Sequence, residues 1–197
     1  MKVSPGEQAR GALDPDKREQ AIAELTSEGY VVLEDCLPPS LTRELSLAYA
    51  EAFEAKRRRL GLRPVERDPR MERNEEVRID FRPEGGNHDL NRWNMHLPSR
   101  RPFLDPRLIA NPIALDLIDA RLGGDCVLTT IASDTPLPGA GFQNIHQDDG
   151  ELRITINVPL VDFREDNAPI EVWPRTHRPH PEDPAFPSSA APHRIGA

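Results

Sequence analysis

Residues 144–150 read Asn-Ile-His-Gln-Asp-Asp-Gly and place a histidine and an aspartate two positions apart. Side chains on an extended strand alternate between its two faces, so His146 and Asp148 would share one face while Gln147 would lie on the other. An imidazole and a carboxylate on one face supply two of the three protein ligands in a 2-His-1-carboxylate site, which suits non-haem Fe(II). The spacing alone is a weak signal, because a solvated surface turn produces the same pair. The neighbouring segments decide between these two interpretations.

The chain after this motif has the pattern of an antiparallel sheet. Residues Leu152–Leu160 alternate apolar and polar side chains for most of their length, which predicts a half-buried strand. Residues 162–167 then predict a turn, and a short strand through Val172 follows before Pro174 ends it. Strands joined by turns in this way are typical of a jelly roll.

Two helices are predicted near the start of the chain. Asp14 is a suitable N-cap and Pro15 suits the first turn of a helix that Gly29 ends. A strand is expected over Tyr30–Leu33, and a second helix runs from residue 38 to near residue 61 with apolar residues at the helical period.

The middle of the chain predicts a mixture of elements. Residues 62–90 are charge-rich and interrupted by proline and by Gly85-Gly86, which indicates an irregular insertion with one strand at Val77–Phe81. Asn91–Leu97 predicts another strand, on which Trp93 and His96 are candidates to touch a substrate, although a core or turn role is the simpler interpretation. A third helix is expected over Pro106–Leu122 and a buried strand over Val127–Ser133.

These segments together predict an α+β fold that is mainly β. The expected architecture is a double-stranded β-helix (jelly roll, cupin-like) with the N-terminal helices packed on one sheet. Residues 14–178 would form this single domain, residues 1–13 a mobile leader and residues 179–197 a Pro-rich tail.

Composition limits the classes of partner. The chain has 197 residues, 21 of them proline, and a formal net charge of -8, which argues against nucleic acid as a partner. No apolar run is long enough to cross a bilayer, so no membrane partner is expected. Cys36 and Cys126 are far apart and in no metal-type pairing, so a reducing cytoplasm is the expected location.

Three segments resemble the phytanoyl-CoA dioxygenase family of Fe(II)/2-oxoglutarate-dependent oxygenases. Residues 29–37 resemble the family's opening strand, and residues 146–148 resemble its iron-binding motif. Residues 167–177 are similar to its "asparagine-glycine, short strand, proline-glycine-threonine-histidine" signature, with Ala168 and Arg175 where glycines are usual. The sequence therefore leaves the tightness of both turns open, because a positive φ costs alanine and arginine more than it costs glycine. The likeness extends from about residue 17 to residue 180.

The resemblance implies an activity and a site. It implies hydroxylation or a related oxidation of a small organic substrate, with O₂ consumed and 2-oxoglutarate decarboxylated to succinate. His146 and Asp148 would bind the Fe(II), and the carboxylate at 148 favours oxidation over halogenation. The candidate contacts to the co-substrate 2-oxoglutarate are Thr155, Asn157 and Gln147, while the polar outer face of a sheet is an equally good explanation for Thr155 and Asn157.

The third iron ligand and the basic residue for 2-oxoglutarate stay open. The resemblance places both on further strands that this chain is expected to lack. Among the later histidines, His177 predicts a hydrogen-bonding or solvent-facing turn residue and His193 a tail residue whose spacing still allows a ligand. An unpaired sheet edge would favour a homo-oligomer. The alternatives are a catalytically inactive, truncated relative that serves as a binding or assembly module, and an unrelated cupin-type metal barrel.

Overall fold

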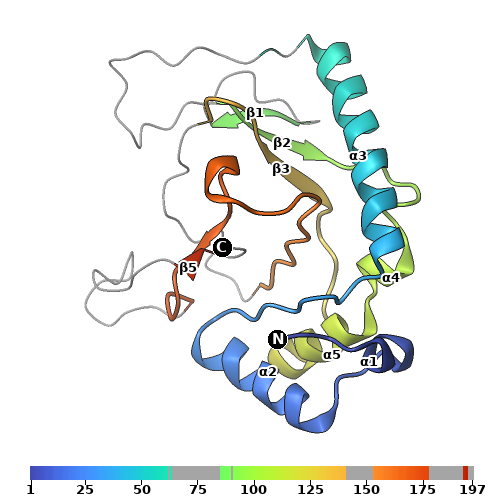
Figure 1. Cartoon of the computed structure of the whole chain (residues 1–197), viewed down its shortest axis with the longest axis vertical. Coiled ribbons are helices and arrows are strands. Elements are labelled where there is room, and N and C mark those ends of the chain that lie inside the picture. The colour runs from blue at the N-terminus through green and yellow to red at the C-terminus, as the bar shows by residue number, and fades with distance from the viewer. Residues whose placement is uncertain (62, 64–84, 90, 141–152, 178–192, 195–197) are drawn as a thin grey trace. The chain divides into compact units, whose positions relative to one another are not determined.

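The computed structural model describes residues 1–61, 63, 85–89, 91–140, 153–177 and 193–194 (Figure 1). The chain divides into two compact units. The helical unit comprises Met1–Thr42, Leu104–Val127 and His146–Ala197, and the sheet unit comprises Arg43–Phe103 and Leu128–Ile145. Each unit has its own core, so each is described by itself.

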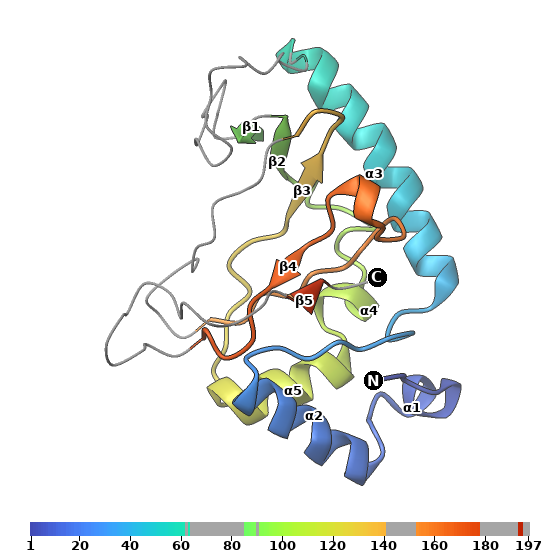
Figure 2. The same cartoon turned by 60° about the vertical axis from the view of Figure 1, so that its left-hand side comes forward.

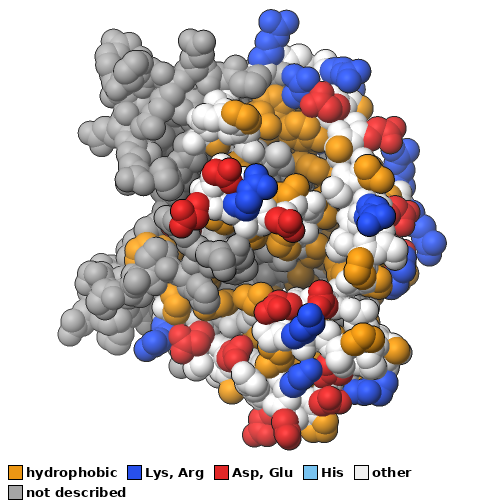
Figure 3. All heavy atoms as spheres, viewed as in Figure 1, with side chains coloured by type: hydrophobic (Ala, Val, Ile, Leu, Met, Phe, Trp, Pro, Cys, Tyr) orange, Lys and Arg blue, Asp and Glu red, His pale blue; other side chains and the backbone are white. Residues whose placement is uncertain are grey.

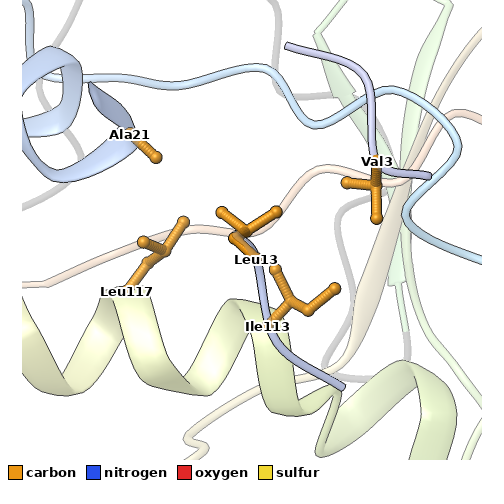
Figure 4. Close-up of a cluster of buried hydrophobic side chains, with 5 residues drawn as sticks. All are labelled: Val3, Leu13, Ala21, Ile113 and Leu117. Atoms are coloured by element: carbon orange, nitrogen blue, oxygen red, sulfur yellow. The ribbon is translucent and has the colours of Figure 1, made fainter. Parts of the chain in front are cut away.

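The helical unit is built on four helices, which are α1 (Pro5–Arg10), α2 (Pro15–Ser27), α4 (Pro106–Ile109) and α5 (Pro112–Leu122). Its buried core joins residues from the first two of these three segments, namely Val3, Leu13, Ala21, Ile113 and Leu117 (Figure 4). An ion pair of 2.6 Å between Arg18 and Asp116 links α2 to α5 at the surface. The helix predicted between Asp14 and Gly29 is confirmed.

Residues 1–13, expected to be a mobile leader, are a folded part of the helical unit. Ser4 and Glu7 form a capping box at the start of α1, Pro5 occupies its first turn, and Gly11 ends it at a φ of 67°. Val3 is 1% exposed in the core, and its backbone N–H donates to the Glu34 carbonyl oxygen at 2.9 Å. The apolar side chain of Val3 therefore anchors a segment whose polar composition gave no sign of burial.

The Glu7 carboxylate is fully buried at the base of this segment. It accepts hydrogen bonds from the backbone N–H groups of Asp14 and Ser4 and from Lys17 Nζ, each at 2.8 Å. The hydrogen bond from Asp14, followed by the one from Lys17, holds the pKa of Glu7 far below its usual value. A buried acid is thus kept charged by donors that hold α1 against the start of α2.

The sheet unit packs helix α3 (Pro39–Leu60) on one face of a three-stranded antiparallel sheet (Figures 1 and 2). The strands are β1 (Gly85–Asp89), β2 (Arg92–His96) and β3 (Ala132–Pro136), in the order β1-β2-β3. Phe53 of α3 packs on Trp93 and Met95 of β2, and these three side chains form the buried centre. The second predicted helix and the strand predicted over Asn91–Leu97 are both confirmed.

Several predicted boundaries differ from the structure. The helix expected over Pro106–Leu122 is interrupted, because Pro112 disfavours helical geometry at Asn111, whose side chain instead caps α5 by accepting from the Ile113 and Ala114 N–H groups. Residues 30–33 form no strand, and Glu34, which follows them, makes an isolated bridge with Lys2.

Of the strand predictions on either side of the metal motif, the one over Val127–Ser133 overlaps β3 only at its last two residues, and the one after the motif is not met in the described residues. Val127 and Leu128 are 80% and 59% exposed in an irregular segment, and β3 begins only at Ala132. Residues 153–159 are irregular and Ile156 is 54% exposed. Gly85-Gly86, expected to interrupt the chain, instead lies in β1. The strand predicted at Val77–Phe81 lies outside the described residues.

The end of the described chain contains a 3₁₀ turn and a second sheet. The turn predicted over residues 162–167 is confirmed by η1 (Glu165–Asn167), and the predicted short strand by β4 (Glu171–Val172). β4 pairs antiparallel with β5 (His193–Arg194), so this part of the expected tail is a strand. The sheets of the described residues do not close into a barrel, so the double-stranded β-helix is not confirmed by them.

The described surface carries charges of both signs. On the face shown in Figure 3, Lys and Arg side chains are interspersed with Asp and Glu and form no continuous positive patch. Among the described helices, none combines the length and the apolar character that spanning a bilayer requires.

Candidate functional site

The predicted metal motif lies outside the described residues. His146, Gln147 and Asp148 all fall within residues 141–152, so the convergence of the first and third of these side chains stays a prediction. Within the described parts of the chain, no group of three or more His, Cys, Asp or Glu side chains is placed to hold a metal ion. The donor set at positions 146 and 148 nevertheless has the imidazole and carboxylate chemistry that Fe(II) accepts.

Thr155 and Asn157, predicted to contact 2-oxoglutarate, are exposed in the irregular segment after the motif. Their shared facing was inferred from a strand, and no strand is formed at these residues. The backbone therefore gives no support to their acting together, and their role stays a prediction.

The signature segment at residues 167–177 keeps two glycine-like turns, a point that the sequence left open. Ala168 has a φ of 55° and Arg175 a φ of 66°, so both non-glycine residues adopt the left-handed conformation. Asn167 fixes the first of the two turns, because its Oδ1 accepts from the Arg164 N–H at 2.8 Å and its Nδ2 donates to the Asp162 carbonyl oxygen at 2.7 Å. The glycine-like backbone is thus retained without glycine.

The second turn of the signature docks on the C-terminal end of α2. The Arg175 N–H donates to the Glu28 carbonyl oxygen at 2.7 Å, and the Arg175 guanidinium Nε lies 3.1 Å from the Glu28 carboxylate. His177 Nε2 lies 3.2 Å from the Thr26 carbonyl oxygen, which can only accept, so this nitrogen donates. His177 is therefore a hydrogen-bonding turn residue, as the sequence predicts.

Gly29 allows this approach. Its φ is 88°, and a Cβ at this position would overlap the imidazole ring of His177. Glycine is required here both for the backbone conformation and for the space. The sequence indicated Gly29 only as the end of a helix, and no pattern within the sequence pointed to its contact with a residue nearly 150 positions away.

The two candidate substrate contacts on β2 lie on opposite faces of the strand. Trp93 is fully buried, with its ring centroid 5.5 Å from that of Phe53, so it is a core residue and not a substrate contact. His96 is exposed and shares its face with Arg92, which pairs with Asp134 of β3 at 2.9 Å. Neither Arg92 nor Asp134 was identified from the sequence. The alternating pattern of Arg92–His96 could have indicated Arg92, because it places this residue on the same face as His96.

Comparison with known families accounts for the motif and the signature together. The family described as phytanoyl-CoA dioxygenase (PhyH) matches residues 25–194. This chain belongs to the phytanoyl-CoA dioxygenase family. Members of the family have a cupin-like jelly-roll fold and are typically Fe(II)- and 2-oxoglutarate-dependent oxygenases acting on small molecules.

The match covers a different range from the likeness expected over about residues 17–180. It begins near the end of α2 and continues to Arg194 in β5, whereas the likeness was expected to end near residue 180. The residues expected to be a tail thus belong to the matched region as far as β5. His146, Asp148 and the docked signature segment all lie within it.

Proposed function

We propose that this chain is an Fe(II)/2-oxoglutarate-dependent dioxygenase that hydroxylates or otherwise oxidises a small organic substrate. The observation that carries the proposal is the family match over residues 25–194, which contains His146 and Asp148 at the spacing of a metal-binding pair. The left-handed backbone at Ala168 and Arg175 supports it, because the signature keeps its turns where the side chains have changed.

His146 and Asp148 would hold the ferrous ion. A neutral imidazole and an ionised carboxylate leave ligand positions open for a chelating oxo acid and for O₂. The bound Fe(II) and 2-oxoglutarate supply the oxidising chemistry, with succinate and CO₂ as the products of the co-substrate. The protein's contribution is to hold the substrate close to the metal and to exclude water.

The 2-oxoglutarate contacts are proposed to come from Thr155, Asn157 and Gln147. Hydroxyl and amide groups can donate to a carboxylate. No third iron ligand is assigned. His193 lies on β5, where it is the register partner of Val172 of β4, and it falls within the family match.

The test is ferrous-ion binding by the full chain under anaerobic conditions, followed by the visible absorption of the complex with 2-oxoglutarate and by succinate formation in air. His146→Ala and Asp148→Ala should each weaken ferrous binding by at least tenfold, because loss of a ligand or of its support typically costs 10–100-fold in affinity. Both variants should also abolish succinate formation.

Asp149→Ala is the matched control, since it removes a neighbouring carboxylate expected on the other side of the strand. This variant should bind iron like the parent chain. Equal binding by Asp148→Ala and the parent would contradict the proposed site. A folded parent chain that binds no ferrous ion would favour the alternative, a family member that acts as a binding or assembly module.

A further inference from the structure

The two faces of the β1-β2-β3 sheet differ in chemistry. On the face covered by α3, Trp93 and Met95 are buried, and the Tyr49 hydroxyl hydrogen-bonds to Ser133 and Thr135. The opposite face carries the residues between these on β2 and β3. We call Arg92, Asn94, His96 and Asp134 the polar sheet face.

The polar sheet face is held together by one ion pair. Arg92 and Asp134 are diagonal neighbours on adjacent strands, and their side chains meet at 2.9 Å between Nη1 and Oδ2. The Arg92 side chain is 14% exposed and the Asp134 side chain 44% exposed. Arg92 Nε is buried without a hydrogen-bond partner among the described residues. A buried charged donor without a partner is costly, which indicates that a ligand atom or water completes it.

Small residues are the register partners of the two other polar side chains on this face. Gly86 of β1 is the register partner of Asn94, and Ala132 of β3 is the register partner of His96. Neither neighbour can cover the longer polar side chain opposite it. Asn94 is half-buried and His96 exposed, so both can reach a molecule that lies over the strand.

Because α3 covers one face of the sheet, the polar character of the opposite face needs an explanation. In layered β folds, a sheet with a helix packed on one face turns its other face either to solvent or to a second layer, and the interior beneath a second layer is normally filled by apolar side chains. Arginine, asparagine, histidine and aspartate at these positions are poor fillers for such a core. They suit contact with a polar molecule.

We propose that the polar sheet face binds the substrate of this family member, and that this substrate is a small zwitterion carrying a carboxylate and a cationic amine. Arg92 binds the carboxylate through its unused Nε–H, and Asp134 binds the amine. Asn94 and His96 hydrogen-bond to polar groups between these two ends. The proposal rests on the proposed function for the oxidation itself, and it argues against a long acyl chain as the group lying on this face.

Free L-amino acids are suitable probes for this proposal. Isothermal titration calorimetry with the full chain, without iron or 2-oxoglutarate, should detect binding of at least one of the twenty. The matching amide, which lacks the carboxylate, and the matching 2-hydroxy acid, which lacks the amine, should each bind at least tenfold more weakly. Because the metal is left out, failure of iron binding and failure of this proposal are separate results.

Charge variants then assign each end of the ligand. Arg92→Met should weaken binding of the amino acid and of the hydroxy acid by at least tenfold. Asp134→Asn should weaken binding of the amino acid but strengthen binding of the hydroxy acid, because it removes the charge that competes for Arg92. A merely structural role for the ion pair cannot produce these opposite shifts.

Arg100→Met removes an exposed guanidinium from the same unit and should leave all affinities unchanged. Circular dichroism confirms that each variant is folded, and Arg92→Lys serves if Arg92→Met is not, since it keeps the charge but loses the Nε donor and should also bind more weakly. Failure of every amino acid to bind at millimolar concentration would overturn the proposal. Equal effects of Arg92→Met and Arg100→Met would overturn it as well.

Discussion

Strand β2 and residues 153–160 have the same alternating pattern in the sequence but different structures. In β2, Trp93 and Met95 alternate with polar residues, and the strand is paired on both sides. Ile154, Ile156 and Val158 alternate in the same way, yet the segment is irregular and Ile156 is exposed. The difference lies in tertiary contacts. Phe53 and Tyr49 of α3 cover the apolar face of β2, and no described helix is packed in this way on residues 153–160.

The largest expected effect tests this comparison directly. Trp93→Ala should lower the free energy of unfolding by about 3–5 kcal/mol, because it removes a fully buried aromatic side chain from the core beneath α3. Ile156→Ala should change it by less than about 0.5 kcal/mol, since that side chain is already exposed. Urea denaturation measures both values. Equal losses in the two variants would show that residues 153–160 are packed as tightly as β2.

Docking of the signature turn is the next contact to break, because it anchors the chain that follows the irregular segment. Gly29→Ala should destabilise by about 1–3 kcal/mol, since its Cβ meets the His177 ring at a backbone φ of 88°. His177→Ala removes the obstacle and leaves only the cost of the backbone conformation. The double variant should therefore be less unstable than the sum of the two single losses, as measured in a double-mutant cycle. Strict additivity would mean that the two residues do not touch.

The smallest effects distinguish the two left-handed positions in the signature. Ala168→Gly should stabilise by roughly 0.5 kcal/mol, because relief of the left-handed strain exceeds the entropy that glycine loses on folding. Arg175→Gly should stabilise less, because it also loses the ion pair with Glu28. Thermal unfolding of the two variants gives the order. A greater gain for Arg175→Gly would show that this ion pair contributes nothing.

Local rules predicted the helices well. The N-cap at Asp14, the proline that follows it and the long apolar period after Pro39 depend on neighbours in the sequence, and α2 and α3 begin where these residues indicate. The positive φ at Ala168 and Arg175 was left open by the sequence, because neither residue is the glycine that is usual at its position. Asn111 shows the limit of this approach, because its cap divides a helix that the apolar period had made continuous.

Pairing of strands was predicted poorly, because it depends on partners remote in the sequence. Val127 and Leu128 have strong strand propensity, but the strand that forms begins at Ala132 and pairs with β2 about 40 residues earlier. β1 forms in spite of Gly85 and Gly86, since β2 provides the edge on which it pairs. The candidate functional residues show the same difference between features that depend on nearby residues and features that depend on remote ones. The pair at 146 and 148 was found by spacing, whereas Arg92 and Asp134 were not.

The sequence by itself identified the family and singled out His146 and Asp148 as a candidate metal-binding pair, because both depend on the identity and spacing of residues close together in the chain. Only the tertiary structure decided which face of β2 is buried, how Gly29 receives His177, and that Val3 and Glu7 belong to a folded core. These features depend on contacts between residues that are distant in sequence. Such contacts form only when burial of apolar surface outweighs the entropy lost in ordering the chain between them.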